Sequence, residues 1–120
     1  MNWFKKASGI RLWLDDERDP RDPFIQQQFG ARGDEEWVRT APEAIQILNM
    51  GNVSYISLDH DLGESGGSGY DVASFIEKNA YDGIINRMEW QVHSANPVGA
   101  KRIQQAMQNA DKFWNRNELV

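Results

Sequence analysis

Hydrophobic and polar positions alternate along several short stretches of the chain. From Ile10 to Leu14 every second residue is aliphatic, a period of two that predicts a strand. Residues 53–58 are mostly apolar, as in a strand covered on both faces, and residues 88–93 alternate again. Residues 37–39 fit a further short strand, so the pattern predicts about four strands.

Apolar residues recur at helical spacing after each of the last three strands. Thr40, Ser68 and Asn96 stand at the start of these stretches, where their side chains can accept hydrogen bonds from the first amides of a helix. Gly51 is placed to end the first helix. The predicted apolar faces are Ala44, Ile45, Ile47 and Leu48 in the first helix, Val72, Phe75 and Ile76 in the second, and Ile103, Ala106, Met107, Ala110 and Trp114 in the third.

Residues 17–36 have neither period. Pro20, Pro23, Gly30 and Gly33 interrupt this segment, and Asp, Arg and Gln fill much of the rest. Because proline and glycine favour turns, we expect the segment to be mainly loop.

The order of these elements predicts the fold. Strands that alternate with helices form parallel sheets, because right-handed crossovers return the chain in the same direction. We therefore predict an α/β fold with a parallel sheet of about four strands and flanking helices. A chain of 120 residues is expected to form a single domain, residues 1–120. The carboxyl ends of the strands then share one edge, beyond which ligands bind in such sheets.

The composition narrows the classes of partner. Hydrophobic residues make up 40% and charged residues 26% of the chain, which is typical of a globular protein. A net charge of -5 disfavours extended binding to DNA or RNA. The absence of cysteine excludes disulfides and thiolate metal ligands and fits a cytoplasmic location, which we expect. No stretch approaches the roughly 20 apolar residues of a membrane span, so no membrane partner is expected.

Asp15 and Asp16 form a carboxylate pair directly after the first predicted strand. Two acids this close resist joint ionisation unless a cation or an arginine offsets their charge. Because Mg²⁺ prefers oxygen ligands, we predict a metal site formed by Asp15, Asp16 and Asp59, with Mn²⁺ as the alternative ion. A solvated turn or a helix cap is an equally good explanation of the pair. Arg18 either contacts a phosphate or balances the two acids.

Asp59, His60 and Asp61 follow the apolar strand at 53–58 without a gap. Three ionisable residues in succession at the end of a buried strand are hard to explain by packing. One aspartate can ligate a metal ion while the other fixes the tautomer of His60, and we assign these parts to Asp59 and Asp61. The alternative is a polar turn before Gly63.

His93 ends the strand at 88–93, and it and His60 are the two histidines of the chain. In phosphoester cleavage one histidine can deprotonate water while another protonates the leaving oxygen, so we predict that these two act as an acid–base pair. A hydrogen-bonded structural His93 is the alternative. Ser94 is predicted to contact phosphate, and Asn96 begins a helix whose free amides can hold an anion.

Two other features are predicted to be structural. Gly66, Gly67 and Gly69 match neither the phosphate-binding loop nor the dinucleotide fingerprint, and we expect a flexible loop there. The five tryptophans are expected in the core, with Trp13 covering a crossover helix, and none is assigned to the site.

Three motifs span most of the chain: LWLDDER at residues 12–18, LDHDLG at residues 58–63 and HSANP at residues 93–97. In their order and spacing they resemble the signatures of the cyclic-phosphate processing receiver-like domain family. The resemblance implies a small three-layer, receiver-like (flavodoxin-like) fold. It also implies an activity on cyclic phosphate ends or cyclic nucleotides.

The chain is less similar to signalling receivers. Asp15 and Asp16 match their acidic pair, and Asp59 matches the position of their phosphoacceptor. Receivers carry a lysine at the end of a further strand, whereas here a helix follows the last strand and Lys101 lies just after Pro97. A phosphoacceptor switch does not require histidines, so these departures favour catalysis over signalling.

The leading hypothesis is a phosphoesterase that acts on a phosphorylated nucleotide or on an RNA end with a cyclic phosphate, assisted by a metal ion; a metal-free route that uses only the two histidines is the alternative mechanism. A noncatalytic nucleotide-binding module and a receiver-like regulatory domain phosphorylated on Asp59 are the alternatives, and the sequence leaves the oligomeric state open. The hypothesis assigns catalysis to His60, His93 and Asp61, substrate binding to Arg18, Ser94 and Asn96, and the metal to Asp15, Asp16 and Asp59.

Overall fold

The computed structural model describes residues 9–119, and it arranges them as alternating strands and helices. The strands are β1 (Ile10–Leu14), β2 (Glu36–Val38), β3 (Val53–Leu58) and β4 (Glu89–Val92). The helices are α2 (Pro23–Phe29), α3 (Ala41–Met50), α4 (Gly69–Tyr81) and α5 (Pro97–Glu118). Within residues 9–119, every helix is too short or too polar to cross a membrane.

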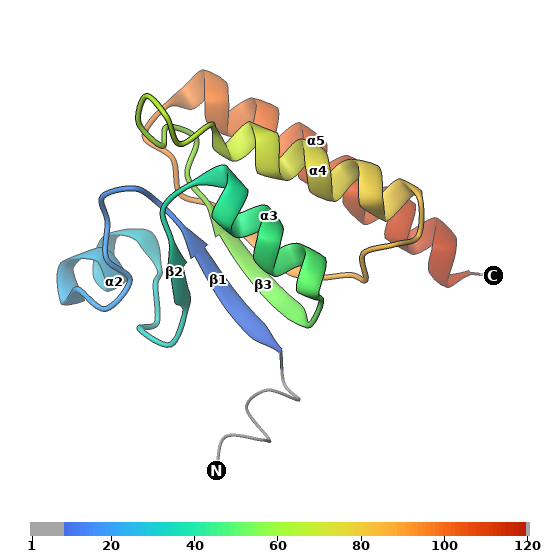
Figure 1. Ribbon diagram of the computed structural model, residues 1–120, viewed down its shortest axis with the longest axis horizontal. Helices are drawn as coiled ribbons and strands as arrows, with labels where there is room; N and C mark the ends of the chain where they lie inside the picture. Colours follow the sequence, from blue (N-terminus) through green and yellow to red (C-terminus); the bar gives the residue numbers. More distant parts are fainter. Residues whose placement is uncertain (1–8, 120) are drawn as a thin grey trace, which may run out of the picture.

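The four strands form one parallel sheet in the order β2-β1-β3-β4, in which β1 and β3 lie at the centre. Figure 1 shows β2, β1 and β3 side by side. Leu14 pairs with Val38 on one side and with Leu58 on the other, and Leu58 pairs with Val92. The predicted parallel α/β fold is therefore confirmed. The strand order reverses between β1 and β3, which is the position where ligands bind in open sheets of this kind.

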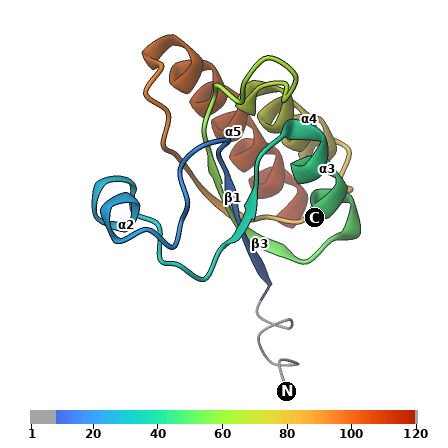
Figure 2. The same ribbon diagram turned by 60° about the vertical axis from the view of Figure 1, so that its left-hand side comes forward.

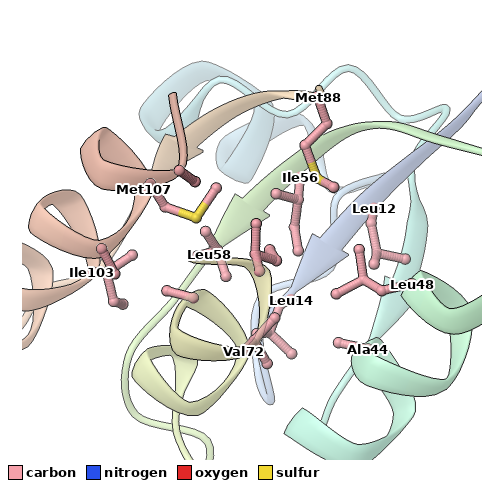
Figure 3. Close-up of a cluster of buried hydrophobic side chains, with 14 of the residues drawn as sticks. Leu12, Leu14, Ala44, Leu48, Ile56, Leu58, Val72, Met88, Ile103 and Met107 are labelled. Atoms are coloured by element: carbon pink, nitrogen blue, oxygen red, sulfur yellow. The ribbon is translucent and has the colours of Figure 1, made fainter. Parts of the chain in front are cut away.

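Helices cover both faces of the sheet, but unequally. Helices α3, α4 and α5 lie on one face and the short α2 lies on the other, so the molecule has three layers (Figure 2). The larger core lies between the sheet and the three helices, and Figure 3 shows part of it. It combines Leu12, Leu14, Ile56 and Leu58 from the strands with Leu48, Val72, Ile103 and Met107 from the helices.

Capping side chains begin three helices where the sequence predicts them. Thr40 and Asn96 each accept a hydrogen bond from an amide three residues further on. Ser68 and Asp71 form a reciprocal capping box at the start of α4. Each cap stabilises its helix by about 1 kcal/mol and fixes the residue at which the helix begins.

The expectation of loop over residues 17–36 is wrong for the central part of that segment, where α2 forms. The side chain of Asp22 caps the helix, and Pro23 occupies its first position. Ile25 is buried in a second, smaller core with Trp13. The helix is only 7 residues long and buries one side chain of its own, so its apolar period is too short to read in the sequence. Trp13 does cover a crossover helix, as predicted, and that helix is α2.

Gly66 and Gly69, before and at the start of α4, are packed closely, which corrects the prediction of a flexible loop. A Cβ atom on Gly69 would lie 1.8 Å from the carbonyl oxygen of Asp59, and one on Gly66 would lie 2.2 Å from that of Leu62. These positions require glycine because the backbone folds against the segment that follows β3. The close packing connects the start of α4 to Asp59.

Candidate functional site

Three predicted site residues lie at the carboxyl edge of the sheet. Asp15, Asp59 and His93 are the first residues after β1, β3 and β4. The amide of each donates a hydrogen bond of 3.0 or 3.1 Å to a carbonyl of the neighbouring strand. The backbone hydrogen bonds of the sheet therefore fix the positions of these three residues.

We define the acidic cluster as Asp15, Asp16 and Asp59. One carboxylate oxygen from each residue lies within 4.8 Å of the others. Asp15 and Asp59 are buried, whereas Asp16 is partly exposed. Three carboxylates at this spacing form an all-oxygen donor set, which suits a hard cation such as Mg²⁺ or Mn²⁺.

Asp15 is held by four donors. Its Oδ1 accepts hydrogen bonds of 2.9 Å from the amides of Glu17 and Arg18. Its Oδ2 accepts from Nη1 of Arg18 at 3.1 Å and from Nε2 of His93 at 3.0 Å. Burial alone would raise the pKa of Asp15, but the hydrogen bonds from His93 and the two amides outweigh burial and lower that pKa. Asp15 is therefore an ionised carboxylate in one fixed orientation.

Asp59 lies in the opposite electrostatic environment. It is 4% exposed, and burial together with the negative charge of Asp15 raises its pKa. Its Oδ2 lies 3.6 Å from Nη1 of Arg18, so that guanidinium bridges two of the three acids. Three carboxylates are offset by the single guanidinium of Arg18, so the acidic cluster carries excess negative charge when its acids are ionised. That excess fits a site for a further cation.

Arg18 contacts Phe29, the last residue of α2, and Trp13 in β1. Its guanidinium lies 4.6 Å from the centroid of the Phe29 ring, and its carbonyl accepts a hydrogen bond of 3.0 Å from Nε1 of Trp13. The helix that the sequence did not predict thus supports the arginine that the sequence did predict.

His93 is built into the interior at 5% exposure, with its ring stacked on Trp13 at 4.0 Å between centroids. Nε2 contacts Asp15, and Nδ1 lies 2.6 Å from Oγ of Ser57. Gln91 donates a 2.8 Å hydrogen bond to the same Oγ. In the neutral ring, Nε2 donates its proton to Asp15, and Nδ1 then accepts from the hydroxyl of Ser57.

Sequence reasoning did not assign Trp13, Ser57 or Gln91 to the site. The signal available was the period of two, which puts these three residues on the same face of their strands. The register then aligns them, because Trp13 pairs with Ser57 and Ser57 pairs with Gln91. Since register depends on the folded sheet, the alternation alone could not reveal the contact.

His60 has a different environment from His93. Its Nδ1 lies 2.9 Å from Oδ1 of Asp61, and this hydrogen bond lowers the pKa of Asp61. The ring packs on the first turn of α5, where a Cβ atom on Gly99 would lie 2.3 Å from the Cγ of His60. The side chain is 18% exposed, and within residues 9–119 no hydrogen bond engages its Nε2. Because the Nδ1 proton of neutral His60 is donated in a hydrogen bond to Asp61, Nε2 is left as a hydrogen-bond acceptor.

Asn96 and Ser94 stabilise the turn between β4 and α5. The Oδ1 of Asn96 accepts from the amide of Gly99 at 3.0 Å, and its Nδ2 lies 3.5 Å from both carboxylate oxygens of Asp61. The hydroxyl of Ser94 accepts from the amide of Asn96 at 3.1 Å. Asn96 therefore joins the start of α5 to the segment that carries His60.

A second arginine, Arg39, lies at the same edge of the sheet as Arg18, and the sequence analysis did not assign it to the site. Arg39 donates hydrogen bonds of 3.0 and 3.2 Å to the carbonyl of Asp16 and lies 4.6 Å over the ring of Trp37. It positions the backbone of Asp16 and leaves the carboxylate of that residue to the acidic cluster.

The predicted site residues thus form two groups rather than one. The two imidazoles do not share a layer: His93 packs against Trp13 and α2, whereas His60 packs against α5. The groups meet at the backbone, where the amide of His60 donates to Oδ1 of Asp59 at 2.8 Å. The first group holds Asp15, Asp16, Arg18, Asp59 and His93. The second, called the His60 group below, holds His60, Asp61, Ser94 and Asn96.

Comparisons with known proteins identify one family. A family model described as the cyclic-phosphate processing receiver domain matches residues 10–109. No curated protein and no solved structure matches the chain. The matched segment contains all the residues of both groups.

Proposed function

The chain belongs to the cyclic-phosphate processing receiver domain family, and from this premise we propose that it hydrolyses a cyclic phosphodiester at the carboxyl edge of its sheet. The proposed substrate is a phosphorylated nucleotide or an RNA end that carries a 2′,3′-cyclic phosphate. The family supports the cyclic phosphate as the reacting group, and the chemistry of the two groups supports hydrolysis.

The observation that carries this proposal is the His60–Asp61 pair beside the acidic cluster. Asp61 accepts a hydrogen bond from Nδ1 of His60, so Nε2 can take a proton from water as a general base. Water oxygen then bonds to phosphorus, and the bond from phosphorus to one ring oxygen breaks. The leaving oxygen takes up a proton, so one water is added and the product is a phosphomonoester.

His93 acts in this proposal as a positioning residue. Both of its ring nitrogens are engaged within the fold, by Asp15 and Ser57. A group so engaged and only 5% exposed is poorly suited to exchange protons with a substrate. Its hydrogen bond instead keeps Asp15 ionised and correctly oriented.

The groups that bind the phosphate in this proposal are Arg18, Ser94 and the amide of Val98 in the first turn of α5. Arg18 is a fork-shaped donor that suits phosphate oxygens. The 22-residue helix α5 supplies the amide of Val98 and a partial positive charge at its first turn, where Pro97 has no N–H and the amide of Gly99 is bound by Asn96. Each of these groups would offset the charge that grows on the phosphate oxygens during the attack.

The acidic cluster fits a resident cation, because its donors are all carboxylate oxygens and its charge is only partly offset by Arg18. We propose that Asp15, Asp16 and Asp59 hold Mg²⁺ or Mn²⁺. Bound there, the ion would supply Lewis acidity toward phosphate oxygens. Arg18, which now bridges Asp15 and Asp59, would then be free to bind phosphate.

The direct test incubates the purified protein with 2′,3′-cyclic and 3′,5′-cyclic mononucleotides in Mg²⁺, in Mn²⁺ and in chelator. We expect conversion of a cyclic phosphate to a monoester, and loss of that conversion in His60→Ala. Tight binding without product would instead support the noncatalytic nucleotide-binding module. Labelling by acetyl phosphate that is lost in Asp59→Asn would support the receiver-like regulatory domain.

A further inference from the structure

A groove between α4 and α5 lies outside the two groups described above. The helices run side by side (Figure 1), and the hollow between them has a volume of about 630 Å³. This volume is within the range of about 300–1,000 Å³ that is typical of sites for small organic ligands. Its walls include Tyr70, Glu77, Val98, Lys101, Arg102 and Ala106.

Both walls of the groove begin beside the His60 group. Tyr70 follows Gly69, whose amide donates a 2.9 Å hydrogen bond to the carbonyl of His60. Val98 lies two residues after Asn96, which contacts Asp61. The groove therefore begins close to the His60 group, so the remaining part of a substrate held there can extend along it.

Charge is distributed unevenly along the groove. Lys101 and Arg102 are exposed cations one turn beyond the start of α5, near the His60 group. At the far end, Glu77 accepts a 2.7 Å hydrogen bond from Asn109, and this pair closes the groove. In a chain of net charge -5, two cations at one end of an apolar hollow favour an occupant with one anionic end.

The groove also contains a flat stacking surface. The guanidinium of Arg102 lies 4.1 Å from the centroid of the Tyr70 ring. Stacked arginine and tyrosine planes are surfaces on which the bases of single-stranded nucleic acids pack. Val98 is 72% exposed on the same wall and adds apolar area for a base or a ribose.

We propose that this groove binds the terminal nucleoside of an RNA 3′ end, with the phosphate on its 5′ side against Lys101 and Arg102. The inference rests on the proposed function, since the cyclic phosphate of the same nucleoside lies at the His60 group. It makes a short oligonucleotide, rather than a free cyclic mononucleotide, the preferred substrate. A free cyclic mononucleotide lacks the 5′-linked phosphate and leaves both cations without a partner.

The test compares kcat/KM for a dinucleotide that ends in a 2′,3′-cyclic phosphate with kcat/KM for the matching cyclic mononucleotide. We expect the wild-type protein to favour the dinucleotide about tenfold, as one or two charge-assisted hydrogen bonds allow. The variant Lys101→Glu/Arg102→Glu should reduce this ratio to about one. The matched control, Lys112→Glu/Arg116→Glu, makes the same charge change on α5 outside the groove, and Arg116 also stacks on a tyrosine. It should keep the ratio.

A second readout needs no turnover. Calorimetric titration with a dinucleotide 3′-monophosphate and with a nucleoside 3′-monophosphate measures the same preference in binding, and we expect the groove variant to lose it. Preferential binding without any hydrolysis would contradict the proposed function and uphold the groove. Equal hydrolysis and equal binding of the long and short probes by the wild-type protein would overturn the groove and leave the proposed function in place.

Discussion

The two histidines of this chain follow neighbouring strands, yet their surroundings differ in almost every respect. The side chain of His93 is 2% exposed, its ring is stacked on Trp13, and both of its ring nitrogens are engaged. The side chain of His60 is 18% exposed and is tied to Asp61 through one ring nitrogen. One imidazole is part of the fold, and the other has a nitrogen that can act on a ligand.

This difference teaches that position at a strand end does not by itself define a role. The role depends on which atoms of the ring remain available once the fold has formed its hydrogen bonds. Both ring nitrogens of His93 are hydrogen-bonded, to Asp15 and to Ser57, so removal of the imidazole should mainly lower the stability of the fold. His60 keeps Nε2 available, so its loss should mainly affect turnover.

The largest expected effect is on turnover in His60→Ala. General-base catalysis contributes about 10²- to 10⁴-fold, so we expect kcat for cyclic-phosphate hydrolysis to fall by at least about 100-fold. Thermal unfolding should change less than in His93→Ala, because the side chain is partly exposed and, among residues 9–119, hydrogen-bonds only Asp61. A variant that unfolds at a much lower temperature would show that His60 is structural and would erase the contrast.

The next effect is on stability in His93→Ala. The substitution removes one hydrogen-bond partner each from the buried side chains of Ser57 and Asp15 and opens a cavity beside Trp13. Together these changes should lower the free energy of unfolding by about 3 kcal/mol. Urea unfolding measures this loss, and His60→Ala is the matched control at the other imidazole. A loss below about 1 kcal/mol would contradict the structural role of His93.

A smaller effect is expected in Asp61→Asn. The carboxamide oxygen of the new side chain can still accept a hydrogen bond from Nδ1 of His60. Because it is uncharged, it no longer stabilises the imidazolium that forms when Nε2 takes a proton. Partner groups of this kind typically contribute roughly 10- to 100-fold, so we expect a fall in kcat toward the low end of that range with KM nearly unchanged. Steady-state kinetics measure both constants, and an unchanged kcat would remove Asp61 from the site.

The smallest effect concerns the pH dependence of stability, measured in chelator. Because the pKa of Asp59 is raised above 3.8, the ionised residue destabilises the fold at neutral pH, and this cost disappears as the pH falls through the raised pKa. Asp59→Asn should therefore be more stable than the wild-type protein at pH 7, by roughly 1 kcal/mol or less. The gain should shrink toward pH 4.

The control for this experiment is Asp15→Asn. The pKa of Asp15 is lowered below 3.8, so its stabilising contribution is present above that value and is lost as the pH falls through the lowered pKa. The two substitutions should thus have opposite signs at pH 7. Mg²⁺ should raise the melting temperature of the wild-type protein and have less effect on either variant, because both lose a carboxylate of the acidic cluster.

Most of the fold was predictable because its signals are local. The alternation from Ile10 to Leu14, the apolar run at 53–58 and the caps at Ser68 and Asn96 each need only a few neighbouring residues. The helix α2 was not predictable in the same way, since it depends on burial of Ile25 beneath the sheet.

The candidate site was predictable only in part. Motifs at strand ends located the acids and the histidines, because parallel strands share a carboxyl edge. The sequence could not distinguish the two imidazoles, since the partners of His93 are far away along the chain. Ser57 is 36 residues and Asp15 is 78 residues from His93, and only the register of the sheet brings them together.

The central claim is that His60 works on a cyclic phosphate while His93 maintains the fold. The most direct measurement follows a 2′,3′-cyclic mononucleotide by ³¹P NMR with equal concentrations of folded wild-type, His60→Gln and His93→Gln protein. The account predicts monoester formation by the wild-type protein, none detectable with His60→Gln, and measurable formation per folded molecule with His93→Gln. Hydrolysis by His60→Gln at the wild-type rate, or no hydrolysis by folded wild-type protein with Mg²⁺ or Mn²⁺, would contradict it.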